Sequence, residues 1–215
     1  LSAYIKRRVI TEEDVLRKVL SAHSFDEAGK FINKIFWRTY FKGWLESRPH
    51  IWAQYCADVH HLTHDLQTQS GLRDRWAAAC LGETGIDCFD AWAKELAETG
   101  YLHNQARMWF ASIWVYTMQL PWQLGADFFL RHLLDGDAAS NTLSWRWVVG
   151  LHSVGKTYLA CAENIQRFTN GRFAPKGLAQ VAPPLNDTAS TMAPKIIGPP
   201  NRYLDGHKTG LLLHS

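Results

Sequence analysis

The chain has 215 residues, of which 47% are hydrophobic and 20% are charged, so its composition is that of a globular protein rather than a disordered one. Its formal net charge of +3 is compatible with a nucleic-acid partner but is too small to indicate one by itself. No apolar stretch reaches the roughly 18 residues of a membrane span, and no signal peptide is visible, which predicts a cytoplasmic location.

Helical patterns begin near the start of the chain. Thr11 is followed three residues later by Asp14, a spacing close to that of a capping box, and apolar residues then share one side up to residue 21. A second helix is predicted over residues 25–47 from its apolar spacing. A third ends at Gly82, because glycine commonly terminates helices.

The helical pattern continues through the middle of the chain. One helix is bracketed by Thr84 and Gly100, and another runs from residue 104 until Pro121. The next starts at residue 122 and runs to an Asp-Gly-Asp turn, after which Asp137 is a good N-cap for a further helix. Because no segment shows sustained period-two alternation, we predict an all-α, multi-helix fold.

The character of the sequence changes at about residue 181. The segment that follows is rich in proline and has no helical seam. We therefore predict a helical domain over residues 1–180 and a tail over residues 181–215. The tail is either an extended strap lying on the domain or a linker.

The cysteines give no sign of a metal or a disulfide framework. None of them shows C-x-x-C spacing, which favours reduced structural thiols and predicts no metal site. They are Cys56, Cys80, Cys88 and Cys161.

An unusual set of side chains follows the Asp-Gly-Asp turn. Asn141 and Trp145 lie four and eight residues after Asp137, so the three project along one face of the predicted helix. An N-capped helix with buried aromatic residues is one interpretation. A binding site is the other, since a carboxylate, a carboxamide and an indole are an odd choice for plain core.

A longer pattern supports the second interpretation. From Thr84 to Trp147 the chain reads T-G-x-x-x-x-D-A, then H-N-x-x-R-M, a tryptophan, D-G-D, and an asparagine four residues before W-x-W. This order resembles the FAD-binding helical domain of the DNA photolyase and cryptochrome family. Upstream, LSAY at 1–4 is similar to the end of the family's flavin phosphate loop, and NKIFWRTY at 33–40 to its N-E-L-x-W-R-E-F/Y motif. The resemblance covers roughly residues 1–173.

The resemblance implies that FAD is bound in a helical pocket. Arg107 would pair with Asp135, and Asn141 would lie beside the redox-active flavin nitrogen N5. A planar guanidinium suits phosphate oxygens, so Arg38 would contact the pyrophosphate together with Ser2. The cofactor-binding residues implied are Ser2, Arg38, Asn104, Arg107, Asp135, Asp137 and Asn141. A relative that keeps these polar residues without a flavin is the alternative.

Two tryptophans match an electron relay. By resemblance Trp145 would lie nearest the flavin ring and Trp122 would come next, and with Asn141 they are the predicted catalytic residues. The family's third tryptophan has no counterpart in this chain that aligns. The other candidates are each favoured as core residues, namely Trp76, Trp92, Trp109 and Trp114.

The resemblance also implies UV-damaged DNA, including single-stranded DNA, as partner. Trp37, Met108 and Trp147 correspond to residues that line the lesion pocket of pyrimidine-dimer photolyases, enzymes that take the damaged pair out of the stack. Relatives that repair (6-4) photoproducts carry histidines at the positions that correspond to Asn104 and Met108. The residues of this chain therefore favour cyclobutane dimers as the lesion. A cluster of basic residues fits either phosphate contacts or a solvated surface, namely Lys156, Arg167, Arg172 and Lys176.

Three departures from the family pattern bear on function. The N-terminal antenna-binding domain is absent, so no second chromophore is expected. The phosphate loop lacks its first three residues. Lys34 stands where dimer photolyases carry a glutamate that hydrogen-bonds the lesion. The leading hypothesis is FAD-dependent, light-driven repair of cyclobutane pyrimidine dimers. The alternatives are a cryptochrome-like photoreceptor without repair activity and a non-catalytic DNA-binding relative.

Overall fold

A computed structural model describes residues 1–187 and 192–195, and within these ranges all of the regular secondary structure is helical. The all-α prediction is therefore confirmed. The elements are α1 (Ser2–Lys6), α2 (Glu12–Leu20), α3 (Phe25–Glu46), α4 (Pro49–Thr68), α5 (Ser70–Leu81), α6 (Asp87–Thr99), α7 (Asn104–Ser112), the π-helical turn η1 (Ile113–Thr117), α8 (Trp122–His132), α9 (Ala138–Val148) and α10 (Ala162–Phe168).

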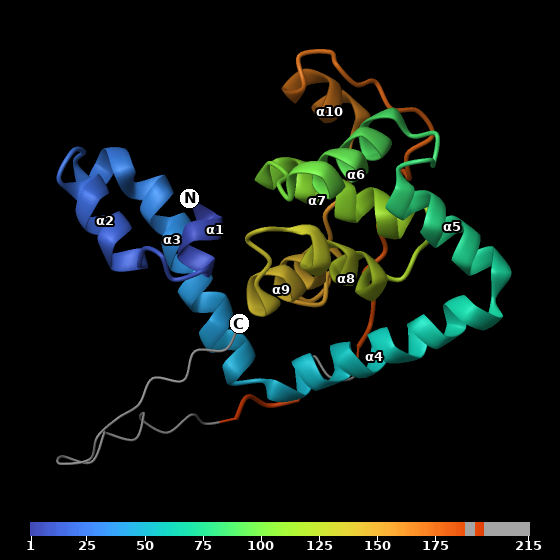
Figure 1. Cartoon of the computed structure of the whole chain (residues 1–215), viewed down its shortest axis with the longest axis horizontal. Helices are drawn as coiled ribbons and strands as arrows, with labels where there is room; N and C mark the ends of the chain where they lie inside the picture. Colours follow the sequence, from blue (N-terminus) through green and yellow to red (C-terminus); the bar gives the residue numbers. More distant parts are fainter. Residues whose placement is uncertain (188–191, 196–215) are drawn as a thin grey trace.

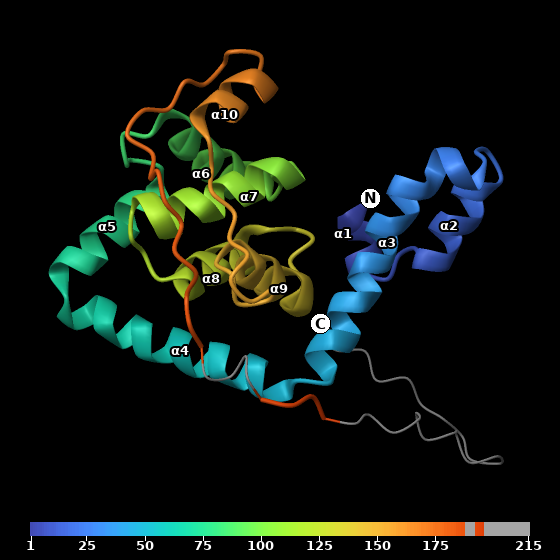
Figure 2. The ribbon, with the colours of Figure 1, turned by 180° about the vertical axis from the view of Figure 1, so that it is seen from behind.

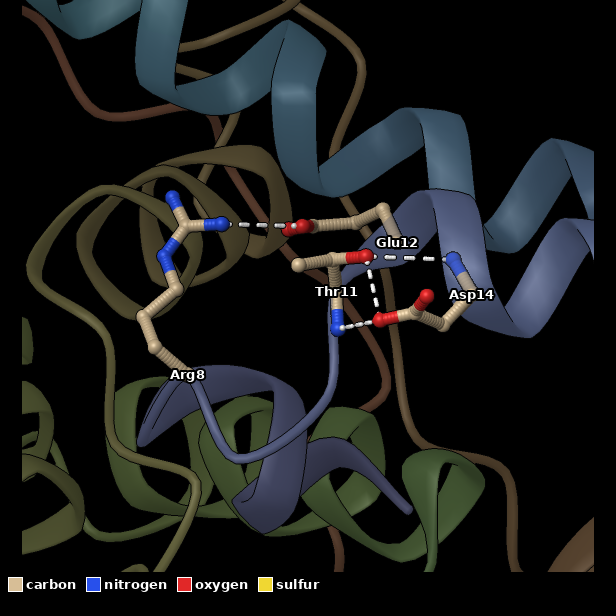
Figure 3. A network of polar contacts seen from close by, with 4 residues as sticks. All are labelled: Arg8, Thr11, Glu12 and Asp14. Atoms are coloured by element: carbon tan, nitrogen blue, oxygen red, sulfur yellow. Dashed lines mark hydrogen bonds and ion pairs between the residues drawn. The ribbon is translucent and has the colours of Figure 1, made fainter.

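The N-terminus of α2 is fixed by a complete capping box, as predicted. The Thr11 hydroxyl accepts a hydrogen bond from the Asp14 backbone N–H at 3.1 Å, and the Asp14 carboxylate accepts one from the Thr11 N–H at 2.9 Å. Figure 3 shows this box together with the Arg8–Glu12 ion pair at 3.0 Å. These contacts satisfy backbone donors that the first helical turn leaves free.

The predicted helix ends are also present at two glycines. Gly82 and Gly100 follow α5 and α6 in the left-handed conformation, with φ of 65° and 66°. At Gly82 a Cβ atom would come within 2.6 Å of the Asp90 carbonyl oxygen, so a side chain would be doubly unfavourable there.

Two stretches differ from the prediction. The helix expected to run from residue 104 to Pro121 changes after Ser112 into η1, which ends at Thr117. The widened turn lets the Trp114 indole N–H donate to the Pro121 carbonyl at 2.9 Å. The long helix α4 carries no side-chain N-cap and was not predicted.

The main core lies between α4 and α9. Its aromatic rings come mainly from α6, α7, η1, α8 and α9, which accounts for much of the tryptophan content. Figures 1 and 2 show α4 running along one side of this group and α1–α3 standing beside it, with α3 next to α9. A second cluster ties α3, α4 and α9 together through Leu45, Ile51, Ala139 and Leu143.

Residues 181–187 are irregular and lie against the helical domain. The Leu185 N–H donates to the Val149 carbonyl at 3.0 Å, and Arg146 forms an ion pair of 2.7 Å with Asp187. The domain boundary at residue 180 stays a prediction, and most of the tail lies outside the described residues. Among the helices in the described part of the chain, none is long and apolar enough to cross a membrane.

Candidate functional site

A cavity of about 960 Å³ opens between α3 on one side and α7 and α9 on the other. Its size is within the range of ligand pockets in proteins, about 300–1,000 Å³. Every site residue predicted from the sequence lines this cavity, with the exception of Trp122. The predicted residues that it brings together are Ser2, Lys34, Trp37, Arg38, Asn104, Arg107, Met108, Asp135, Asp137, Asn141, Trp145 and Trp147.

An ion pair joins α7 to the turn before α9. The Arg107 Nη2 atom lies 3.1 Å from both carboxylate oxygens of Asp135, while its Nε donates to the Leu102 carbonyl at 2.9 Å. The two side chains are 24% and 10% exposed. The predicted pairing is present, and it fixes a half-buried charge pair in the cavity wall.

The start of α9 presents two further polar groups. Asp137 caps the helix by accepting a hydrogen bond from the Ser140 N–H at 2.9 Å, as predicted. The Asn141 side-chain nitrogen donates to the Ala126 carbonyl at 2.7 Å. That bond orients the carboxamide and uses one of its two N–H donors, so its second N–H and its carbonyl oxygen are the groups left for a ligand.

Trp145 is the buried indole of the cavity wall. It is 2% exposed, its ring meets those of Phe129 at 5.1 Å and Trp114 at 6.2 Å, and its Nε1 has no hydrogen-bond partner. Gly125 on α8 lies against it so closely that a Cβ atom there would overlap the indole ring. The ring is therefore held in one position.

Trp122 lies on the neighbouring helix α8, outside this cavity. It lines a separate cavity of about 650 Å³ and stacks on Tyr55 of α4, with ring centres 5.7 Å apart. Burial raises the pKa of the Tyr55 hydroxyl above its usual value, with a further contribution from the Asp127 charge. The relay role of Trp122 and Trp145 stays a prediction.

The α3 side of the cavity holds a guanidinium without a partner. Arg38 Nε and Nη2 are buried and make no hydrogen bond. Buried donors left unpaired cost about 1–3 kcal/mol each, more when charged, so this wall suits an anionic ligand group. Ser140 Oγ, Trp145 Nε1 and His152 Nδ1 are other buried, unpartnered atoms of residues that line the cavity. The Arg38, Ser140 and Trp145 donors fit the diphosphate and polar ring of a dinucleotide such as FAD.

The mouth of the cavity is aromatic. Trp37 and Trp147 are 53% and 36% exposed, and Tyr40 packs edge-on against Trp37 with ring centres 5.2 Å apart. Exposed aromatic rings at an opening of this kind offer stacking surfaces for flat ligands. Lys34 and Asn104 are exposed beside them, and Met108 is half-buried.

His152 lines the cavity but was not predicted as a site residue. It follows α9 in an irregular turn, belongs to no motif, and is placed by packing against the α3 rings Phe41 and Trp44. Burial lowers the pKa of His152 below its ordinary value, and the nearby Arg146 and Arg48 charges lower it further.

The remaining candidates lie outside the cavity lining. The basic residues Lys156, Arg167, Arg172 and Lys176 are all exposed. Trp92, Trp109 and Trp114 are buried in the main core and Trp76 packs against it, which confirms the core interpretation. No group of three or more metal-ligating side chains occurs among residues 1–187 and 192–195.

Comparison with known proteins gives a consistent result. The family model described as the FAD-binding domain of DNA photolyase matches residues 16–176. A deoxyribodipyrimidine photo-lyase of Streptomyces griseus is 36% identical over 121 residues, which are 56% of this chain and 25% of that protein. One from Thermus thermophilus is 33% identical over 130 residues, 58% of this chain and 29% of that protein. The chain thus spans little more than a quarter of these relatives.

Proposed function

This chain belongs to the family of the FAD-binding domain of DNA photolyase, and from that premise we propose that it repairs cyclobutane pyrimidine dimers in DNA with light. The observation that carries the proposal is the convergence of the predicted flavin and lesion residues on one cavity. Four free cysteines agree with a reducing, cytoplasmic location.

FAD is the cofactor of this family, and when bound it supplies the light-driven electron that splits the dimer. Arg38 and Ser2 hold its diphosphate, since Arg38 carries two buried donors without a partner. The Arg107–Asp135 pair and the fixed Asn141 carboxamide hold the ring and ribose. Trp145, backed by Gly125, excludes water from that wall, and with Trp122 it would form a relay that passes electrons from an external reductant toward the flavin.

The cavity mouth receives the DNA. Trp37 and Trp147 give two exposed indoles on opposite walls, one from α3 and one from α9, on which the two linked pyrimidines of an extruded dimer stack. Met108 supplies an adaptable apolar wall between them and the flavin. The general acid and base of a hydrolase are not needed, because the bonds of the dimer break by electron transfer.

A photoreceptor without repair activity is the second candidate, and Lys34 is the observation that favours it. An exposed ammonium at the cavity mouth donates hydrogen bonds but cannot accept one from a lesion. A lysine also attracts the DNA backbone regardless of sequence or damage.

The absorption spectrum of the freshly purified protein, before and after blue light, is the first test. We expect one non-covalent FAD per chain, bleached by light in the presence of a thiol, and slow loss of thymine dimers from a single-stranded oligonucleotide. A colourless protein that does not take up added FAD would remove the flavin assignment. Light-induced bleaching of the flavin without any repair of the dimer would support the photoreceptor function instead.

A further inference from the structure

His152 occupies a defined place at the outer part of the cavity. Its ring lies 4.9 Å from that of Trp44, 5.7 Å from Phe41 and 6.1 Å from Tyr40. Phe41 in turn lies 5.5 Å from the exposed Trp37, so His152 is one ring away from the stacking surface at the mouth. Its Nδ1 atom is buried and has no hydrogen-bond partner.

The surroundings of His152 favour the neutral form of its ring. Arg146 on α9 and Arg48 after α3 are the charged groups near it, and both disfavour a second positive charge. Arg146 is itself paired with Asp187, and Tyr40 is the titratable side chain in ring contact. Burial acts in the same direction, so the pKa of His152 lies below the ordinary histidine value. A neutral imidazole always carries one nitrogen that accepts a hydrogen bond.

Lys34 belongs to the same part of the cavity. Lys34, Trp37 and Phe41 follow one another at i, i+3 and i+7 along α3, and all three line the cavity. The ammonium is a donor only, and His152 packs on the Phe41 end of this stripe. A donor and an acceptor therefore stand on either side of an exposed indole.

This arrangement is complementary to the imide edge of a pyrimidine, in which an N–H group lies between two carbonyl groups. We propose that His152 accepts a hydrogen bond from the imide N–H of a pyrimidine stacked at Trp37, while Lys34 donates to a neighbouring carbonyl. His152 thereby supplies the acceptor that Lys34 cannot provide. The inference rests on the proposed function and names the residues that select the damaged base.

The test is binding in the dark, which measures recognition without turnover. FAD-loaded protein is titrated into two labelled single-stranded oligonucleotides that differ only in one thymine dimer, and fluorescence anisotropy gives both affinities between about pH 8 and about pH 5. His152→Phe keeps the aromatic packing and removes the acceptor. His152→Gln keeps an acceptor that does not titrate. His132→Phe is the matched control, because His132 also packs on an aromatic ring, that of Phe128, but does not line the cavity.

We expect His152→Phe to reduce the preference for damaged DNA about tenfold near pH 7, the effect of one lost hydrogen bond of about 1–2 kcal/mol. The wild-type preference should fall as the pH drops below the ordinary histidine range, because the imidazolium only donates. His152→Gln should keep part of the preference and lose its pH dependence, and His132→Phe should behave as wild type. FAD content and circular dichroism establish that each variant is folded.

Three results would overturn the inference. An unchanged preference and pH profile in His152→Phe shows that His152 does not contact the base, and leaves the proposed function intact. A wild-type protein that binds FAD but prefers damaged DNA at no pH removes the DNA-repair part of the proposed function, and the role of His152 with it. A preference lost equally in His132→Phe assigns the effect to folding and also rejects the inference.

Discussion

The two walls of the cavity are built differently. On the wall formed by α7 and α9, Arg107, Asp135 and Asn141 already have partners within the protein. On the α3 wall, Arg38 has two buried donors without a partner, and Trp37 is more than half exposed. The fold therefore supplies the ion pair and the carboxamide contact of the wall formed by α7 and α9 (the inner wall), although Ser140 Oγ and Trp145 Nε1 have no partner there. On the α3 wall the charged guanidinium itself is left for what binds to it.

The difference has a physical origin. The inner wall belongs to the main core, where packing fixes each side chain and a polar group without a partner would be costly. The α3 wall faces that core across the cavity and is tied to α9 near its C-terminal end through Leu45 and the cluster around it. A wall that is anchored at one end can hold polar groups that lack a protein partner, and these groups then lower the stability of the fold less than they would in the main core.

Removing the inner ion pair is expected to have the largest effect. Asp135→Ala leaves the Arg107 guanidinium half-buried without its carboxylate, which costs about 3 kcal/mol and weakens FAD binding about a hundredfold. Isothermal titration with FAD measures the change. Asp127→Ala is the control, because it breaks the pair with the exposed Arg131 outside the cavity and should change affinity little. Equal effects of the two changes would contradict an organised inner wall.

Gly125→Ala tests the packing behind Trp145. The added Cβ would overlap the Trp145 ring and lie 3.0 Å from Trp114, so the indole must shift at a cost of about 2 kcal/mol. Thermal unfolding measures the loss, and near-ultraviolet circular dichroism reports the displaced indole. Gly43→Ala on α3 is the control, since nothing lies within 4 Å of its Cβ position and alanine favours the helix. A Gly125→Ala variant as stable as wild type would show that the Trp145 indole can shift at little cost in stability.

Arg38→Met should act with opposite sign on the two states of the protein. Without FAD, the exchange removes unpartnered buried donors and should stabilise the fold slightly, by up to about 1 kcal/mol. FAD binding should weaken by about 1.5 kcal/mol, because a charge-assisted phosphate contact is lost. Urea unfolding with and without FAD separates the two effects. Destabilisation of both states would mean that Arg38 serves the fold and not the ligand.

The sequence predicted those features that depend on local chemistry. Thr11, Gly82 and Asp137 each act within one helical turn, and each was recognisable from its own neighbours. The helix α4 was missed because Arg48, the residue before its start at Pro49, makes no side-chain cap, and because a single residue separates α4 from α5.

The candidate site was recognised through long spacings that match a family, and its outer part was not. His152 reaches the cavity through contacts with rings more than a hundred residues earlier in the chain, which no local pattern encodes. Trp122 was predicted to lie behind Trp145 and not beside the flavin, and the fold places it against Tyr55 and outside the cavity. Proximity of this kind follows only from the packed structure.

The smallest expected effect concerns the support of the α3 wall. α2 packs on α3, and Thr11→Ala removes the hydroxyl of its capping box, which should lower stability by about 1 kcal/mol. FAD affinity should not change, because α2 contributes nothing to the cavity lining. Thr63→Ala is the control, since its hydroxyl bonds to a carbonyl within α4 and alanine is well accepted there.

The pH dependence of this change checks its cause. Hydrogen bonds from the Thr11 side chain and then from its backbone lower the pKa of Asp14. A lowered carboxyl pKa contributes stability above the unfolded-state value, and the contribution is lost as the pH falls through the folded-state value. Part of the difference between wild type and Thr11→Ala should therefore disappear in acid. A stability difference that is constant with pH would show that the pKa of Asp14 does not depend on the Thr11 hydroxyl. A change in FAD affinity would show that α2 helps to position the α3 wall.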